Sequence, residues 1–266
     1  MPEKNIELFI LAHLKQRSAM DGNEQKFPLF QGLSTENLRR LLSNAGVGSF
    51  PAGAEIVRQG DTANFLYFII SGGVKTIRYS TNGLEATLRM LTAGETFMDA
   101  VIFMDGNSPI NAQTTEKSIL LMIPSETVRR HALHDPQFAL NLLKIVTRHY
   151  RDSLQQIDGI VTKTPVERLG RYFLKLHLDQ KKDSMEIELP FQKAVIANHL
   201  GITPETFSRA LLQIRKMGVD AEKETLTLHN FHVLCRFCDL DLAQTCARRN
   251  TGKCTHRESR AQKRAS

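Results

Sequence analysis

The chain has 266 residues, of which 41% are hydrophobic and 24% charged, so it is long enough for one or two domains with apolar cores. No run approaches the roughly 18–20 apolar residues of a membrane span, and the apolar stretch at residues 6–14 lacks the small-residue cleavage site of a signal peptide. We therefore expect a cytoplasmic protein whose four cysteines are reduced and act as ligands or redox groups rather than as disulfides.

The net charge of +7 is concentrated near the C-terminus. Residues 248–266 hold seven basic residues and one acidic residue, which leaves the rest of the chain near +1. A basic tail favours nucleic acid because it neutralises phosphates, but a solvated tail that only keeps the protein soluble fits equally well. The charge therefore does not decide whether the protein binds DNA.

The N-terminal residues 1–33 predict a helical lead-in. Leu8, Leu11 and Leu14 have the spacing of one helix face. Ser34 then stands where the N-cap of a second, short helix is expected.

Residues 34–135 have the pattern of a β-domain. Short β-rich segments alternate with glycine-containing turns, which is typical of an antiparallel sandwich or barrel. The strands are expected at residues 56–60, 65–70, 73–79, 85–91 and 118–123.

Residues 136–163 predict one long helix that begins at Pro136. Apolar residues recur along it at heptad-like intervals, at Leu143, Val146, Tyr150, Ile157 and Ile160. Because such a helix is too long to pack only on a small domain, we interpret it as a dimerisation helix, with an ordinary core helix as the alternative.

Residues 164–232 predict a small α/β domain. Thr164 and Pro165 end the long helix and begin the next one, a short strand follows at residues 185–189, and a β-hairpin is expected at residues 217–228. The last segment, residues 233–266, is a cysteine-rich basic tail.

Residues 192–214 have the pattern of a helix-turn-helix and read QKAVIANHLGITPETFSRALLQI. Ala197 supplies the small residue where the two helices cross, and Gly201 can take the left-handed turn conformation. Thr203 is expected to cap the second helix, with Pro204 at its first position.

The second helix would present Glu205, Ser208 and Arg209 near its N-terminus, at the positions that reach base edges in the major groove. Lys193 and Arg215 are candidates for phosphate contacts. A helical hairpin that binds nothing is the alternative, but the spacing, the cap and the polar residues together favour DNA binding.

The run PETFSR at residues 204–209 resembles the E-x-x-S-R recognition helix of the Fnr branch of the Crp/Fnr family. Three upstream segments resemble the effector domain of that family: FPAGAEIVRQG at 50–60, YFIISG at 67–72 and GETF at 94–97. The resemblance spans residues 27 to 232. It implies an α+β fold with an N-terminal antiparallel β-roll of the cyclic-nucleotide-binding type, a long dimerisation helix and a C-terminal winged helix-turn-helix.

Within this family, residues 97–105 and 189–209 are similar to the Dnr type, which regulates denitrification and nitrogen-oxide respiration. The resemblance implies a homodimeric transcription regulator, an activator or a repressor, that binds double-stranded DNA at palindromic TTGAT-like half-sites and acts on RNA polymerase. An effector-binding module without DNA binding is the alternative from another class. Motifs of hydrolases, P-loop proteins and zinc proteases are absent from the sequence, so we expect no enzyme.

The family's cyclic-nucleotide members use a Gly-Glu pair and a downstream Arg-Ser to bind ribose and phosphate. This chain has Gly94 and Glu95, but residues 105–109 read DGNSP and contain no arginine. Because a phosphate needs a cation or clustered N–H donors, this segment argues against a cyclic nucleotide. We expect Gly94 and Glu95 to be turn and strand-end residues.

The similarity to the Dnr type also implies haem and nitric oxide. His13, among apolar neighbours in the lead-in, is the candidate axial ligand, although a histidine on an apolar helix face is more often structural.

The four cysteines form one set with the spacing Cys235-x2-Cys238-x7-Cys246-x7-Cys254. Four thiolates suit an iron–sulfur cluster, which is our first hypothesis, or zinc, and Cys235 with Cys238 alone suits a thiol switch. Alternative nitrogen ligands lie nearby at His229, His232 and His256. Since no cysteine precedes residue 235, the cluster that Fnr-type oxygen sensors carry ahead of the β-roll is absent.

Overall fold

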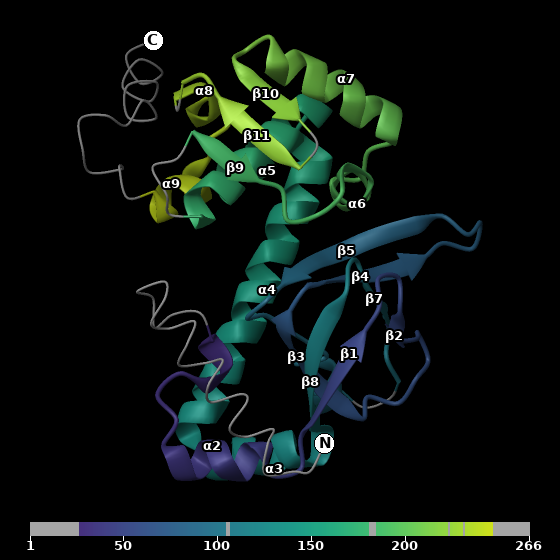
Figure 1. Ribbon diagram of the computed structural model, residues 1–266, viewed down its shortest axis with the longest axis vertical. Helices are drawn as coiled ribbons and strands as arrows, with labels where there is room; N and C mark the ends of the chain where they lie inside the picture. Colours follow the sequence, from purple (N-terminus) through teal and green to yellow (C-terminus); the bar gives the residue numbers. More distant parts are fainter. Residues whose placement is uncertain (1–26, 105–106, 181–184, 223, 231, 247–266) are drawn as a thin grey trace. The chain divides into compact units, whose positions relative to one another are not determined.

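The computed structural model describes residues 27–104, 107–180, 185–222, 224–230 and 232–246 (Figure 1). The predictions for residues 1–26 and 247–266, which include His13 and Cys254, lie outside the described residues. The chain forms two compact units, which divide between residues 154 and 155. This division falls within the long helix, and each unit is described by itself below.

The first unit is a β-domain with helices before and after it in the chain. Its elements are η2 Pro28–Phe30, α2 Thr35–Leu42, β1 Gly46–Phe50, β2 Glu55–Val57, β3 Phe65–Ser71, β4 Gly73–Tyr79, β5 Glu85–Thr92, β6 Thr96–Phe97, η3 Val101–Phe103, β7 Asn111–Thr114, β8 Ser118–Pro124, α3 Ser125–His134 and the greater part of α4, Pro136–Thr162.

The strands form two antiparallel sheets, with the orders β1-β8-β3-β6 and β2-β7-β4-β5 among the described residues. The tight turn between β3 and β4 depends on Gly72, whose φ is +89°. A Cβ there would lie 2.7 Å from the backbone oxygen of Lys117, so only glycine fits. The antiparallel β-roll expected from the sequence is confirmed.

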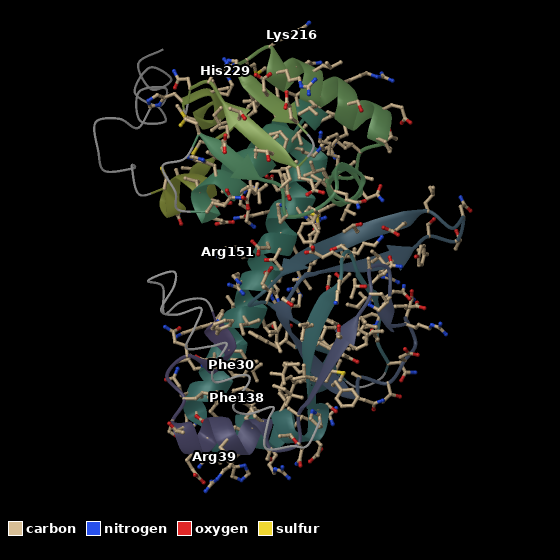
Figure 2. All side chains as sticks on the ribbon, viewed as in Figure 1. Phe30, Arg39, Phe138, Arg151, Lys216 and His229 are labelled. Carbon is tan, nitrogen blue, oxygen red and sulfur yellow. The ribbon has the colours of Figure 1, made fainter. Side chains whose placement is uncertain are left out.

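One apolar core fills the first unit. It joins inward-facing residues of β3 and β8 to η2, α2 and the start of α4. Phe30 and Phe68 have ring centroids 5.0 Å apart, and Phe138 of α4 is fully buried in the same cluster (Figure 2). The short helix α2 begins as expected, because the Ser34 side chain accepts a hydrogen bond from the Asn37 N–H.

Helix α4 occupies the range predicted for the dimerisation helix to within one residue. Asp135 begins it by accepting bonds from the N–H groups of Gln137 and Phe138. Away from the core, the helix exposes a line of large apolar side chains. They are Leu140, Leu143, Tyr150, Leu154, Ile157, Ile160 and Val161. Val146, which the sequence pattern placed on the same seam, is instead half-buried.

The second unit contains the end of α4 and a small α/β domain (Figure 1). Its further elements are α5 Pro165–Asp179, β9 Glu186–Glu188, α6 Lys193–His199, α7 Pro204–Arg215, β10 Val219–Glu222, β11 Thr225–Leu228, α8 His232–Cys235 and α9 Leu240–Thr245. The three strands pair antiparallel in the order β10-β11-β9. The winged helix-turn-helix predicted for the C-terminal domain is therefore confirmed.

Helix α5 is the central helix of this unit. Thr164 and Glu167 form a capping box at its start, and the buried Leu169 and Phe173 give it an apolar face. Helices α7 and α8 both pack against it. Across the described residues, no helix combines the length and the apolar character that a membrane span requires.

Candidate nucleic-acid interface

Helix α7 begins as the sequence predicts. The Thr203 hydroxyl accepts a bond from the Thr206 N–H, and Pro204 takes the first helical position. One face of the helix is buried through Phe207, Ala210, Leu211 and Ile214. Burial of that face fixes the rotation of α7, so the opposite face must point to solvent.

Glu205, Ser208 and Arg209 lie exposed on that opposite face, within the first two turns. The pKa of Glu205 is lowered by hydrogen bonding to its own backbone N–H and to the Thr203 hydroxyl, so its carboxylate is charged at neutral pH. The Ser208 hydroxyl donates to the Pro204 carbonyl at 2.9 Å and keeps its lone pairs free. The helix end therefore offers a charged acceptor, a hydroxyl and a guanidinium.

The turn before α7 is fixed from two other helices. Gly201 has a φ of +63°, and Ala197 is fully buried where α6 packs. Gln156 of α4 donates to the His199 carbonyl at 3.0 Å, and Arg168 of α5 donates to the Leu200 carbonyl at 2.7 Å. The last carbonyls of α6 thus gain partners, which sets the direction of the turn.

The two predicted phosphate contacts lie in different settings. Lys193 is the first residue of α6 and is half-buried. Arg215, at the end of α7, donates from Nη2 to the Ala221 carbonyl at 2.5 Å and so ties α7 to the first wing strand, β10. The turn that leads from α7 into β10 contains Gly218, which has a φ of +100°.

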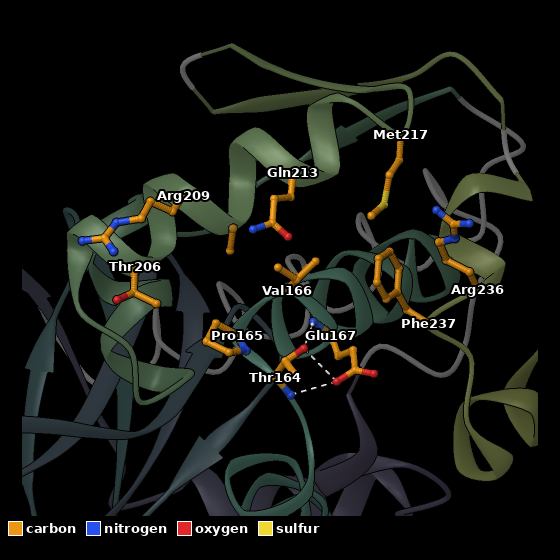
Figure 3. Close-up of a pocket in the computed structure, with 11 residues that line it drawn as sticks. Thr164, Pro165, Val166, Glu167, Thr206, Arg209, Gln213, Met217, Arg236 and Phe237 are labelled. Carbon is orange, nitrogen blue, oxygen red and sulfur yellow. Dashed lines mark hydrogen bonds between the residues drawn. The ribbon is translucent and has the colours of Figure 1, made fainter.

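A groove of about 650 Å³ runs along one side of α7 (Figure 3). The start of α5 forms its other wall, and the segment after α8 closes one end. Its lining residues are Thr164, Pro165, Val166, Glu167, Thr206, Arg209, Ala210, Gln213, Met217, Arg236 and Phe237.

Of the predicted metal ligands, Cys235, Cys238 and Cys246 lie among the described residues, and all three are partly exposed. Cys235 ends α8, and a turn closed by the bond from the Cys238 N–H to the Cys235 carbonyl, 3.1 Å, follows it. Cys246 follows α9. Within the part of the chain that the structure describes, no three His, Cys, Asp or Glu side chains come together to hold one metal ion.

The histidines considered as alternative ligands are differently placed. His229 Nε2 lies 2.7 Å from Asp220 Oδ2, across the wing, where Figure 2 labels it. His232 begins α8 and is exposed, and His256 lies outside the described residues.

In the β-domain, Gly94 and Glu95 are turn residues, as predicted. The Gly94 N–H donates to the Ile69 carbonyl at 2.8 Å, and the Glu95 carboxylate accepts from the Thr92 N–H at 2.8 Å. Ser108 is buried and donates to the Ile110 carbonyl.

A buried polar cluster that the sequence analysis missed connects the β-domain to α4. Arg89 of β5 donates to His149 Nε2 of α4 at 2.6 Å, and His149 Nδ1 lies 3.3 Å from Asp99 Oδ1. Arginine can only donate, so His149 Nε2 is the acceptor. Thr96 also donates to Asp99, at 2.7 Å.

Two family models match the chain. The cyclic nucleotide-binding domain matches residues 47–135, and the Crp-like helix-turn-helix domain matches residues 167–237. In the structure, as in these matches, the β-domain comes first in the chain and the helix-turn-helix domain second, with α4 between them. The chain belongs to the Crp/Fnr family.

Crp/Fnr regulators are also found among individual relatives. The "Cyclic AMP receptor protein" of Thermus thermophilus is 28% identical over 192 residues, which are 72% of this chain and 87% of that protein. The "Transcriptional activator protein FnrA" of Stutzerimonas stutzeri is 26% identical over 191 residues, 69% of this chain and 76% of that protein. The structure of FixK2 from Bradyrhizobium japonicum shares the fold, with a TM-score of 0.66, 21% identity and coverage of 73% of this chain and 98% of FixK2.

As a Crp/Fnr protein, this chain is a DNA-binding transcription regulator and not an enzyme. Helix α7 is the second helix of its helix-turn-helix. The match to the helix-turn-helix model ends at residue 237, so Cys235 lies inside the matched region and Cys238 and Cys246 lie beyond it.

Proposed function

We propose that two copies of this chain bind one palindromic DNA site through α7 and regulate transcription in response to a redox, oxygen or nitrogen-oxide signal. The exposed set Glu205, Ser208 and Arg209 at the capped start of α7 carries the DNA-reading part of this proposal. Arginine pairs with guanine through two hydrogen bonds, and a carboxylate accepts from the cytosine amino group. Lys193 and Thr203, at the starts of α6 and α7, are the proposed backbone contacts, with Arg215 beside the wing.

The proposed operator contains TTGAT-like half-sites. The resemblance of residues 204–209 to the Fnr recognition helix supports it, as does the similarity to an activator named FnrA. The single G·C pair of TTGAT gives a guanine for Arg209 and a cytosine for Glu205. By the same resemblance, the bound dimer acts on RNA polymerase as an activator.

The test is the affinity of the full-length protein for an inverted TTGAT repeat and for the same duplex with both G·C pairs replaced by A·T. We expect the replacement to cost about 1–3 kcal/mol for each half-site. Equal affinity for the two duplexes would contradict the proposed operator.

The dimer is proposed to form along α4. Exposed apolar residues at positions 143, 150, 154, 157 and 161 follow intervals of seven, four, three and four, which is the spacing of a coiled-coil seam. A second copy of the same helix is the partner that fits such a seam, because a two-fold interface uses the same surface twice.

The signal is proposed to act at the cysteine segment. Cys235 and Cys238 lie in one turn and suit two ligand positions of an iron–sulfur cluster, while Cys246 and Cys254 would supply the other thiolates. Since the described thiols are not gathered into a ligand set, loading would have to draw Cys246 toward this turn. A bound cluster would supply the redox and gas chemistry, with zinc and a haem ligated by His13 as alternatives.

Metal analysis of protein purified without oxygen tests this part. We expect iron with acid-labile sulfide in the wild type and loss of both in Cys238→Ser, with unchanged helix content by circular dichroism. Zinc alone would reduce the segment to a structural role, and a Soret band would indicate haem. If the purified protein contained none of these groups, the cofactor hypothesis would be contradicted. A thiol switch formed by Cys235 and Cys238 would then be the remaining hypothesis.

A further inference from the structure

The turn that carries Cys235 and Cys238 is attached to α5 at two neighbouring positions. A Cβ added to Gly170 would overlap the Phe237 ring, so the absent side chain leaves the space that this ring fills. Arg171 forms an ion pair with Asp239, and the Asp239 carboxylate also accepts from the Leu242 N–H at 2.9 Å. The residues on both sides of Cys238 are therefore fixed to α5.

Arg236 lies between the two cysteines, and its side chain is exposed. It lines the groove beside α7 together with Arg209, Gln213 and Met217 (Figure 3). In that view the Phe237 ring points toward Val166 at the floor, whereas Arg236 lies at the end of the groove near Met217. The turn thus adds a cation to a surface that already contains the recognition arginine.

The groove has the charge and the surface chemistry of a nucleic-acid backbone site. Its lining contains Arg209 and Arg236 and one acid, Glu167, whose carboxylate accepts from the Thr164 N–H at 2.8 Å and from its hydroxyl at 2.7 Å. The positive end of the α5 dipole adds to the two cations. The apolar side chains of the floor, Val166 and Phe237 among them, can contact deoxyribose.

We infer that Arg236 binds the sugar–phosphate backbone of the half-site that α7 reads, and that the Cys235–Cys238 turn is thereby part of the DNA-binding surface. This inference rests on the proposed DNA-reading role of α7. A helix in the major groove has a phosphate strand on each side, and the groove that contains Arg236 runs along one side of α7 and shares Arg209 with the base-reading face.

The consequence concerns how the cysteine segment regulates binding. Cys235 and Cys238 flank Arg236 and Phe237 directly, so any ligand or bond that reshapes this turn moves the Arg236 guanidinium. Because a phosphate contact has no sequence preference, such a change alters affinity for all DNA and leaves the preferred sequence unchanged.

The experiment compares full-length wild type, Arg236→Ala and Arg236→Lys in binding to the inverted repeat and to a scrambled duplex over a series of salt concentrations. For Arg236→Ala we expect several-fold weaker binding to both duplexes, with the slope of log K against log salt reduced by about one per protomer. Arg236→Lys should restore the slope. Arg130→Ala, which removes an exposed arginine of α3, is the matched control and should change neither quantity.

An unchanged slope and affinity in Arg236→Ala, with wild type binding the inverted repeat, would overturn this inference alone. In that case a protein, rather than DNA, would be the partner to test for this groove. A wild type that binds neither duplex would instead overturn the proposed function. A loss confined to the inverted repeat would show base reading and would likewise contradict a backbone contact.

Discussion

At the scale of single residues, the helix-turn-helix separates base-reading side chains from supporting ones. Glu205 and Arg209 are exposed on α7. Among the contacts of the described residues, none is a hydrogen bond from the Arg209 guanidinium to another helix or strand. Arg215 instead bonds the Ala221 carbonyl and so shapes the wing. Two arginines of one helix are therefore held differently, and the proposed phosphate contact of Arg215 would come in addition to its bond to the wing.

Replacing Arg209 by alanine removes the only cation on the base-reading part of α7. We expect a loss of about 1–3 kcal/mol at the specific site and a relaxed preference at one base pair, because a bidentate pair with guanine is lost. Binding measured on the inverted repeat and on its single-base variants checks this. Arg78→Ala in the β-domain, also exposed, should leave both affinity and preference unchanged, and an equal effect of the two substitutions would contradict the assigned role.

The sequence predicts the residues that cap the helices, but it does not predict the side chains that hold the turn before α7. Thr203, Thr164 and Ser34 act within three residues of their partners, so the sequence alone reveals them. The bonds from Gln156 to His199 and from Arg168 to Leu200 join residues 43 and 32 positions apart. No local periodicity encodes such pairs, and the fit of Phe237 against Gly170 escaped the sequence analysis for the same reason.

At the scale of elements, strands that coincide with β-rich segments between glycine-containing turns were predicted, and strands without that composition were missed. Strand β1 contains Gly46 and Gly48, which weaken its pattern. Strand β7 is polar because its buried side chains bond neighbouring loops. Asn111 accepts from the Gln59 N–H at 2.9 Å, and Thr114 donates to the Pro51 carbonyl at 2.7 Å. Their partners lie more than fifty residues away, so the sequence pattern cannot identify them.

Helix α4 is connected to the β-domain by the cluster of Arg89, Asp99 and His149. Burial would raise the pKa of Asp99, but contact with His149, the Arg89 charge and the Thr96 hydroxyl outweigh it, so this pKa lies below its usual value. Charges on Glu95, Arg148 and Asp152 also act on Arg89, whose own pKa is lowered by burial. The cluster therefore stabilises the contact between the β-domain and α4 more strongly when Asp99 is ionised.

The acid stability of the protein should reflect this joint. A carboxyl with a depressed folded-state pKa stabilises the fold above its unfolded pKa of about 3.9, and that contribution is lost as pH falls through the folded value. We expect Asp99→Asn to cost roughly 3 kcal/mol at neutral pH, because the largely buried Arg89 loses the nearby negative charge of Asp99, and to reduce the decline in stability toward pH 3. Urea unfolding at several pH values measures both effects.

Glu116→Gln is the control for that experiment, since Glu116 is an exposed acid of the same domain. It should leave the unfolding free energy at neutral pH unchanged. If Asp99→Asn and Glu116→Gln gave the same pH profile, the assigned contribution of the buried cluster would be wrong.

At the scale of the whole molecule, α4 links the two units. Its first half is buried in the β-domain core through Phe138, Leu142 and Ile145, and its last turns contact the helix-turn-helix through Gln156. A shift of two such helices along their seam would change the separation of the two α7 helices. The two α7 helices would then no longer have the spacing of a palindrome whose half-sites lie about one helical turn apart.

The most direct test of this account is sedimentation of the full-length protein, alone and on the inverted repeat. We expect a species of twice the 30.0 kDa chain mass and two chains on each duplex. Ile157→Asp on the seam should give monomers, whereas Leu133→Asp, which alters an exposed apolar residue of α3, should not. A wild type that is monomeric in solution and binds the duplex as one chain would contradict the central claim that two copies read one palindrome.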